Sequence, residues 1–138
     1  MDVRRINDHV SVAPQISPED LPTLKAMGFT TVVNNRPDGE TSGQPSDATM
    51  RQAAEALGLD YHFIPLGRDG VGPELIAQTR TALEGSAGPV LCYCRSGTRS
   101  TTLWALSQAG EMPADEIVGL AAGAGYDMSH LLGYLSQK

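Results

Sequence analysis

Residues 89–103 have the sequence Pro-Val-Leu-Cys-Tyr-Cys-Arg-Ser-Gly-Thr-Arg-Ser-Thr-Thr-Leu. The first five residues are apolar and β-leaning and follow Gly88, which predicts a buried central strand. From Thr101 the apolar residues recur at helical spacing, and Gly110 supplies an end, which predicts a helix. Residues 94–100 therefore form a loop between a strand and a helix.

Such a loop can turn its backbone N–H groups inward, and the helix that follows adds the positive end of its dipole. We therefore expect residues 94–100 to form a socket for an anion. Cys94 stands at the edge of this socket, where the same field lowers the pKa of a thiol and favours the thiolate. Arg99 lies at the start of the helix and would oppose the dipole unless an anion compensated for it. The pattern predicts a nucleophilic Cys94, with Arg99 and the loop amides holding the group that it attacks.

Length and composition indicate one domain over residues 1–138 with its own core. The chain is 41% hydrophobic and 19% charged, and its net charge of −6 argues against a nucleic-acid or anionic-membrane partner. No apolar run has transmembrane or signal-peptide character, and two cysteines two positions apart do not staple a secreted fold. A cytoplasmic protein is therefore expected. Four of the ten basic residues, Arg36, Arg68, Arg95 and Arg99, lie in or beside segments at the predicted strand ends, which predicts a local positive site for a small anionic substrate. The three histidines share no ligand spacing, so neither a metal nor a cofactor is expected.

Strand and helix signals alternate along the chain. Strands are expected at 9–13 (an edge strand), 29–34, 59–66 and 89–93, and helices at 17–28, 46–58, 73–85, 101–110, 113–123 and 128–135. This order predicts an α/β fold with a mostly parallel sheet of four to five strands and helices on both faces. Ligands of such sheets bind outside the carboxyl ends of the strands. The polar loops that start at Asn34, Gly67 and Cys94 should therefore meet at one site.

The spacing within the loop bears on its chemistry. Protein tyrosine and dual-specificity phosphatases have five residues between the catalytic Cys and Arg, whereas four residues separate Cys94 from Arg99. This shorter loop resembles that of rhodanese-type sulfurtransferases, which carry sulfur as a cysteine persulfide. A shorter ring of amides suits a persulfide or thiosulfonate better than a phosphoryl group with three equatorial oxygens. The loop alone favours sulfur chemistry.

Four motifs together resemble the bacterial family described as beta-lactamase hydrolase-like protein, phosphatase-like domain. They are Asn34–Glu40, Gln44-Pro45, Tyr93–Ser100 and Ala124–Asp127. The resemblance spans nearly the whole chain and implies a cysteine-phosphatase fold, similar to that of dual-specificity phosphatases, with a short Cys-to-Arg loop. Members of this family are described as nonclassical phosphatases or as sulfur transferases, so the resemblance implies an enzyme of one of these two kinds.

Asp69 is the candidate general acid, because it lies on the loop that carries this residue in dual-specificity phosphatases. A phosphatase needs such an acid to protonate the leaving alkoxide, whereas sulfur transfer to a thiolate acceptor needs it much less. Asp69-Gly70 is also a standard turn pair, and the two interpretations stay open. Asp38-Gly39 has the same ambiguity.

The remaining site candidates are supporting residues. Asn34 and Arg36 are expected to brace or line the site. The anion-binding loop comprises Arg95, Ser96, Gly97, Thr98 and Ser100; Arg95 is expected to act through its amide, and Ser100 either to hydrogen-bond the Cys94 thiolate or to cap an amide. Cys92 is either a second reactive thiol or, as its strand position favours, a small core residue.

Three hypotheses follow for the function. The loop spacing and Tyr93, where phosphatases usually have a histidine, favour a sulfurtransferase in which Cys94 takes up a sulfane sulfur and passes it to a thiol acceptor. The fold resemblance and Asp69 favour the alternative, a phosphatase with a phosphocysteine intermediate. A non-catalytic sensor of persulfides or anions has only the small size of the chain in its favour.

Overall fold

The computed structural model describes all residues, 1–138. It contains one five-stranded sheet in the order β1-β2-β5-β3-β4. The strands are β1 (Arg4–Arg5), β2 (Val10–Ala13), β3 (Thr31–Asn34), β4 (Asp60–Phe63) and β5 (Val90–Tyr93). All neighbouring strands pair in parallel except β1, which runs antiparallel to β2. The predicted α/β fold is confirmed, and the predicted central strand is β5.

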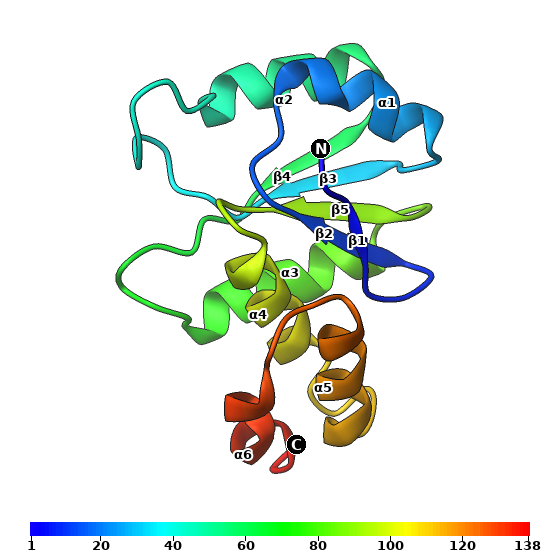
Figure 1. Cartoon of the computed structure of the whole chain (residues 1–138), viewed down its shortest axis with the longest axis vertical. Coiled ribbons are helices and arrows are strands. Elements are labelled where there is room, and N and C mark those ends of the chain that lie inside the picture. The colour runs from blue at the N-terminus through cyan, green and yellow to red at the C-terminus, as the bar shows by residue number, and fades with distance from the viewer.

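Helices cover both faces of this sheet, as Figure 1 shows. On one face lie α1 (Leu21–Ala26), which follows a short 3₁₀ turn at Pro18–Asp20, and α2 (Asp47–Ala56); on the other lie α3 (Pro73–Glu84) and α4 (Thr98–Ser107). Beyond α4 the chain forms α5 (Ala114–Gly123), a 3₁₀ turn at Ser129–Leu131 and α6 (Leu132–Leu135). None of these helices combines the length and the apolarity needed to cross a membrane.

The side chains of β5 divide the hydrophobic core into two layers. Leu91 and Tyr93 pack with the residues under α1 and α2, whereas Val90 and Cys92 pack with Trp104 of α4. Successive side chains of a strand point to opposite faces, so a strand covered on both sides must be apolar throughout. This is why residues 89–93 lack polar alternation, and it makes Cys92 a core residue.

Several element predictions differ from the structure. The strand predicted at 59–66 is limited to Asp60–Phe63, and the helix predicted at 128–135 is a 3₁₀ turn at Ser129–Leu131 followed by α6. The strand at 9–13 was expected at an edge, but β2 lies between β5 and β1. The strand at that edge of the sheet, β1, consists of two exposed arginines, and so short a polar segment has no hydrophobic period to detect. Helix α4 begins at Thr98, three residues before the predicted start at Thr101. The prediction missed this first turn because residues 98–100 are polar and the apolar spacing does not extend to them.

Backbone hydrogen bonds join the loops at the carboxyl end of the sheet. The Cys94 amide donates to the carbonyl of Ala13 at 3.4 Å, and the Asn35 amide donates to the carbonyl of Tyr93 at 2.8 Å. The Leu66 amide in turn donates to the carbonyl of Asn35 at 2.9 Å. The segments that follow β3, β4 and β5 therefore lie side by side, as the parallel topology requires.

Candidate active site

Cys94 lies at the carboxyl end of the central strand and is fully buried. Its Sγ atom accepts a hydrogen bond from the Gly97 amide at 3.1 Å. A contact of this kind orients a peptide dipole toward the sulfur and stabilises negative charge on it. Because no part of Cys94 is exposed, an incoming group reaches the sulfur only when neighbouring side chains move aside.

The loop around Cys94 contains backbone N–H groups without acceptors. The amides of Arg95, Ser96, Arg99 and Ser100 donate to no protein atom, and the Thr98 amide makes only a 3.4 Å contact with the Ser96 Oγ. Unpaired backbone donors gathered at a helix N-terminus bind anions. This part of the chain therefore has the donors that the sequence motif predicts.

Gly97 is the residue that allows the loop to turn so tightly. It has φ +91° and is the N-cap of α4. Residues with a Cβ rarely adopt this left-handed conformation, whereas glycine does so at little cost. The turn aims the Gly97 amide at Cys94 and lets α4 begin at the next residue.

Arg99 is held by a carboxylate, Glu40, that the sequence did not single out. Arg99 Nη1 and Nη2 donate to Glu40 Oε2 and Oε1 at 2.7 and 2.8 Å, a two-point contact. Arg36 Nε donates to the same Oε1 at 2.8 Å. The hydrogen bonds from Arg99 dominate in lowering the pKa of Glu40 to about 2, and Arg36 lowers it further. Glu40 is thus a fixed negative charge between two guanidinium groups.

The contacts of Arg99 leave part of its guanidinium free. Nη1 uses its second proton on the carbonyl of Leu66 at 3.0 Å. The Nε proton and one Nη2 proton have no oxygen acceptor in the protein. Contact with Glu40 raises the pKa of Arg99, and Cys94 contributes in the same direction, which means that the guanidinium lies close to the sulfur. Glu40 therefore fixes Arg99 beside Cys94 with two donors to spare.

Arg36 and Asn34 lie behind this arrangement. Arg36 is buried, and its Nη1 donates to Gln15 Oε1 at 3.0 Å. Asn34 is also buried; its Oδ1 accepts from the Arg36 amide, and its Nδ2 donates to the Tyr61 hydroxyl. The structure thus brings the predicted supporting residues together with Arg99, through Glu40.

Ser100 is buried in the first turn of α4, and its Oγ has no hydrogen-bond partner. A buried hydroxyl without a partner is costly. Its position one residue after Arg99 places it next to the loop. Of the other predicted loop residues, Arg95, Ser96 and Thr98 expose their side chains to solvent. What these three residues contribute to the socket is mainly their backbone.

The two candidate acids differ in their surroundings. Asp38 Oδ1 accepts a hydrogen bond from the Asp47 amide at 2.8 Å, so it serves the start of α2. Asp69 is exposed in a turn closed by a hydrogen bond from the Gly70 amide to the Gly67 carbonyl, and its carboxylate has no protein partner. The loop that carries it follows Leu66, whose carbonyl contacts Arg99. Asp69 is therefore both a turn residue and an unengaged carboxylate.

Neither a disulfide nor a metal-binding cluster is found beside Cys94. Both cysteines are free thiols. Burial raises the pKa of Cys92 to about 12, and the neighbouring Cys94 adds to this effect, as expected for a core residue. No group of three or more His, Cys, Asp or Glu side chains is arranged to hold a metal ion.

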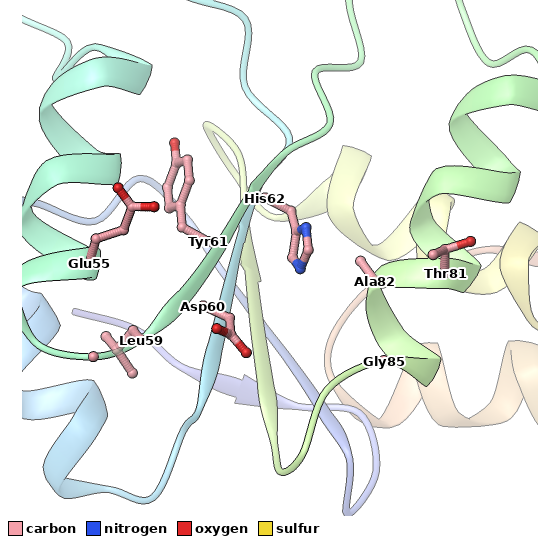
Figure 2. A pocket seen from close by; sticks show the side chains of 9 residues that line it. Glu55, Leu59, Asp60, Tyr61, His62, Thr81, Ala82 and Gly85 are labelled. Atoms are coloured by element: carbon pink, nitrogen blue, oxygen red, sulfur yellow. The ribbon is translucent and has the colours of Figure 1, made fainter.

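A separate hollow of about 550 Å³ lies beside the edge strand β4, between α2 and α3 (Figure 2). Its lining includes Glu55, Asp60, His62 and Thr81. It contains none of the residues of the Cys94 loop. The free edge of the sheet and the candidate active site are therefore different surfaces.

Two relevant residues escaped the sequence analysis. Glu40 belongs to the loop after β3, which lacks any hydrophobic period, and Tyr126 lies 30 residues beyond Ser96, whose carbonyl accepts its hydroxyl proton at 2.9 Å. Both lie in motifs that carry the family resemblance, and membership of these motifs is the one sequence signal that could have identified them.

Comparison with known proteins gives the family. The family model described as "Beta-lactamase hydrolase-like protein, phosphatase-like domain" matches residues 2–111. A beta-lactamase hydrolase-like protein of Agrobacterium fabrum is 34% identical over 140 residues, and the match covers 100% of this chain and 32% of that protein. The chain thus spans about a third of the length of the curated relatives it matches.

Solved structures agree with this assignment. A structure from Neisseria meningitidis Z2491, described as a candidate phosphatase, has a TM-score of 0.84 at 31% identity and covers 99% of this chain and 98% of its own. The PTP-2 phosphatase of Cydia pomonella has a TM-score of 0.71 at 19% identity, covering 99% of this chain and 89% of its own, which shows the fold alone. The fold is that of the cysteine phosphatases, and the chain belongs to the beta-lactamase hydrolase-like protein, phosphatase-like domain family.

Proposed function

We propose that this protein is a cysteine-dependent phosphatase that hydrolyses phosphate monoesters. The observation that carries the proposal is the set of unused donors around Cys94: four backbone amides and two protons of the Arg99 guanidinium. Donors arranged in advance around a nucleophile stabilise charge that develops on the transferred group. The structure from Neisseria meningitidis, described as a candidate phosphatase and similar over 99% of this chain and 98% of its own, supports the same chemistry.

The reaction has two steps. The Cys94 thiolate attacks phosphorus, a sulfur–phosphorus bond forms, and the bond from phosphorus to the ester oxygen breaks. Asp69 gives its proton to the leaving oxygen, so the product leaves as an alcohol. Water then attacks the phosphocysteine, Asp69 takes the proton of that water, and the sulfur–phosphorus bond breaks to release phosphate and the thiolate.

Asp69 is preferred to Asp38 as the acid because its carboxylate is unengaged. Asp38 already accepts a hydrogen bond from the backbone at the start of α2, which holds its carboxylate at that helix. Asp69 lies three residues after Leu66, whose carbonyl contacts Arg99.

Sulfur transfer is the second candidate, because one specific observation favours it. Four residues separate Cys94 from Arg99, one fewer than in tyrosine phosphatases. In this reaction the Cys94 thiolate attacks the outer sulfur of thiosulfate, sulfite leaves, and the cysteine persulfide hands its outer sulfur to a thiolate. Such a cycle has little need for Asp69.

The test compares turnover of p-nitrophenyl phosphate in the wild type with that in Cys94→Ser, Asp69→Asn and Asp38→Asn. We expect no turnover in Cys94→Ser and a kcat about 100-fold lower in Asp69→Asn, with Asp38→Asn much less affected. Intact mass after incubation with thiosulfate then reports whether one sulfur atom is added to the wild type. Full turnover in Cys94→Ser would refute the phosphatase, and sulfur addition with no phosphatase turnover would establish the second candidate instead.

A further inference from the structure

One peptide group of the loop makes two hydrogen bonds in opposite directions. The amide of the Ser96–Gly97 peptide, carried by Gly97, donates to Cys94 Sγ at 3.1 Å. The carbonyl of the same peptide, carried by Ser96, accepts from the Tyr126 hydroxyl at 2.9 Å. A trans peptide is rigid and planar, and its C=O and N–H point in opposite directions within that plane. Whatever fixes the carbonyl therefore also fixes the direction of the N–H.

The structure makes room for the Tyr126 hydroxyl at this peptide. A Cβ on Gly97 would overlap Tyr126 Oη and would lie 2.9 Å from its Cζ. The missing side chain of Gly97 thus serves two purposes, the left-handed turn and the approach of the tyrosine. Tyr126 is only partly buried, yet burial raises the pKa of its hydroxyl, which keeps the proton available for donation at neutral pH.

Tyr126 is itself held from the opposite end of the chain. Arg4, on β1, donates from Nη1 to the carbonyl of Ala124 at 3.2 Å, and its guanidinium lies 5.7 Å from the centre of the Tyr126 ring. A Cβ on Gly125 would collide with this guanidinium. The Tyr126 amide also donates to the carbonyl of Ala121 at the end of α5. The ring is therefore anchored by two elements that do not belong to the loop.

We propose that Tyr126 is a positioning residue for the nucleophile, acting through the Ser96–Gly97 peptide to keep the Gly97 N–H directed at Cys94 Sγ. Donation to the carbonyl also polarises the peptide and makes its N–H a stronger donor. The proposal rests on the proposed function only in taking Cys94 as the nucleophile, and it holds for phosphate and for sulfur chemistry alike.

Three titratable groups are coupled to Cys94: Cys92 on β5, Arg99 on α4 and Tyr126 beyond α5. Arg99 is cationic throughout the neutral range, and Cys92 remains protonated, because burial raises its pKa to about 12. A change in the ionisation of Cys94 on alteration of Tyr126 therefore reports on the Tyr126 contact.

The test is Tyr126→Phe, which keeps the ring and removes the hydroxyl. The rate of alkylation of Cys94 by iodoacetamide is measured against pH, with Cys94 distinguished from Cys92 by fragment ions in the mass spectrum. We expect the midpoint of this profile to move upward by about 0.3 to 1 pH unit, the equivalent of one hydrogen bond to the sulfur weakened or lost. Tyr134→Phe is the matched control, because the Tyr134 hydroxyl makes no hydrogen bond and its ring lies on α6; its profile should match that of the wild type.

Three outcomes are distinguishable. An upward shift in Tyr126→Phe but not in Tyr134→Phe supports the positioning role. An unchanged midpoint overturns it, even if the urea midpoint of Tyr126→Phe falls, because a purely structural contact would lower stability without changing the ionisation of the sulfur. A wild type whose Cys94 does not react at any pH would instead overturn Cys94 as the nucleophile.

Discussion

Glu40→Gln is the most informative substitution, because it removes one charge and almost no volume. Glu40 holds Arg99 through two hydrogen bonds and Arg36 through one. Its pKa falls from 4.5 to about 2 in the folded protein. At 1.36 kcal/mol for each pKa unit this shift corresponds to at most about 3 to 4 kcal/mol. Solvent reaches 28% of the Glu40 side chain, and screening of such a pair reduces the contribution to about 1 kcal/mol.

The pH dependence of this contribution has a definite sign. Between pH 4.5 and about 2 the unfolded chain binds a proton at Glu40 that the folded protein does not, so stability falls as the pH falls through this window. Glu40→Gln lacks the titrating group. We therefore expect the wild type to be more stable than the variant by about 1 kcal/mol at pH 7, and this difference to shrink steadily below pH 4.5.

Urea midpoints of the two proteins at pH 7, 5, 4 and 3 measure this difference, and p-nitrophenyl phosphate kinetics at pH 7 measure its effect on the site. In Glu40→Gln, Arg99 loses the charged two-point contact and is held mainly by the carbonyl of Leu66, and a misplacement of about 1 Å costs roughly 100-fold in rate. An equal stability difference at pH 3 and pH 7 would refute the electrostatic account. An unchanged kcat/KM would show that Glu40 does not hold Arg99 for catalysis.

Two further substitutions test the loop itself. Gly97→Ala places a Cβ at φ +91° and against Tyr126, so we expect a loss of about 2 kcal/mol in urea unfolding and of most turnover; Gly119→Ala, which meets nothing within 4 Å in α5, should be neutral or stabilising by comparison. Arg99→Lys keeps the charge, but a lysine cannot both make the two-point contact with Glu40 and leave two donors for a substrate. We therefore expect a kcat/KM about 100-fold lower in initial-rate kinetics. Arg51→Lys on α2 should stay near the wild-type value, and a similar loss there would mean that the assay reports on stability alone.

The central part of the site could be predicted because its information is local. A β-leaning run, Gly97 and an arginine at the start of a helix lie within a few residues, and each has a direct physical meaning. The meeting of the loops that start at Asn34, Gly67 and Cys94 followed from one topological fact, since parallel strands share a carboxyl edge. The fold was predicted for the same reason, because alternation of strands and helices is visible in periodicity.

The rest could not be predicted because it depends on long-range contacts of segments without a period. Glu40 reaches Arg99 across 59 residues, and Tyr126 reaches Ser96 across 30. No spacing rule connects either pair. Strand β1 was not predicted because two exposed arginines form no pattern. The contact by which Arg4 of this strand anchors Tyr126 was therefore not predicted either. Such contacts depend on the course of the chain in space, which local composition does not determine.

The proposed anion socket consists of main-chain atoms, and this affects how the protein can evolve. Arg95, Ser96 and Thr98 expose their side chains, while the backbone of the same loop presents the unpaired donors. Every amino acid except proline supplies the same N–H at these three positions. Substitutions at these positions can change the charge, size or polarity of the surroundings of a bound group, while the backbone N–H groups that would bind the anion stay the same. Substrate preference can therefore change during evolution while the loop keeps its anion-binding donors.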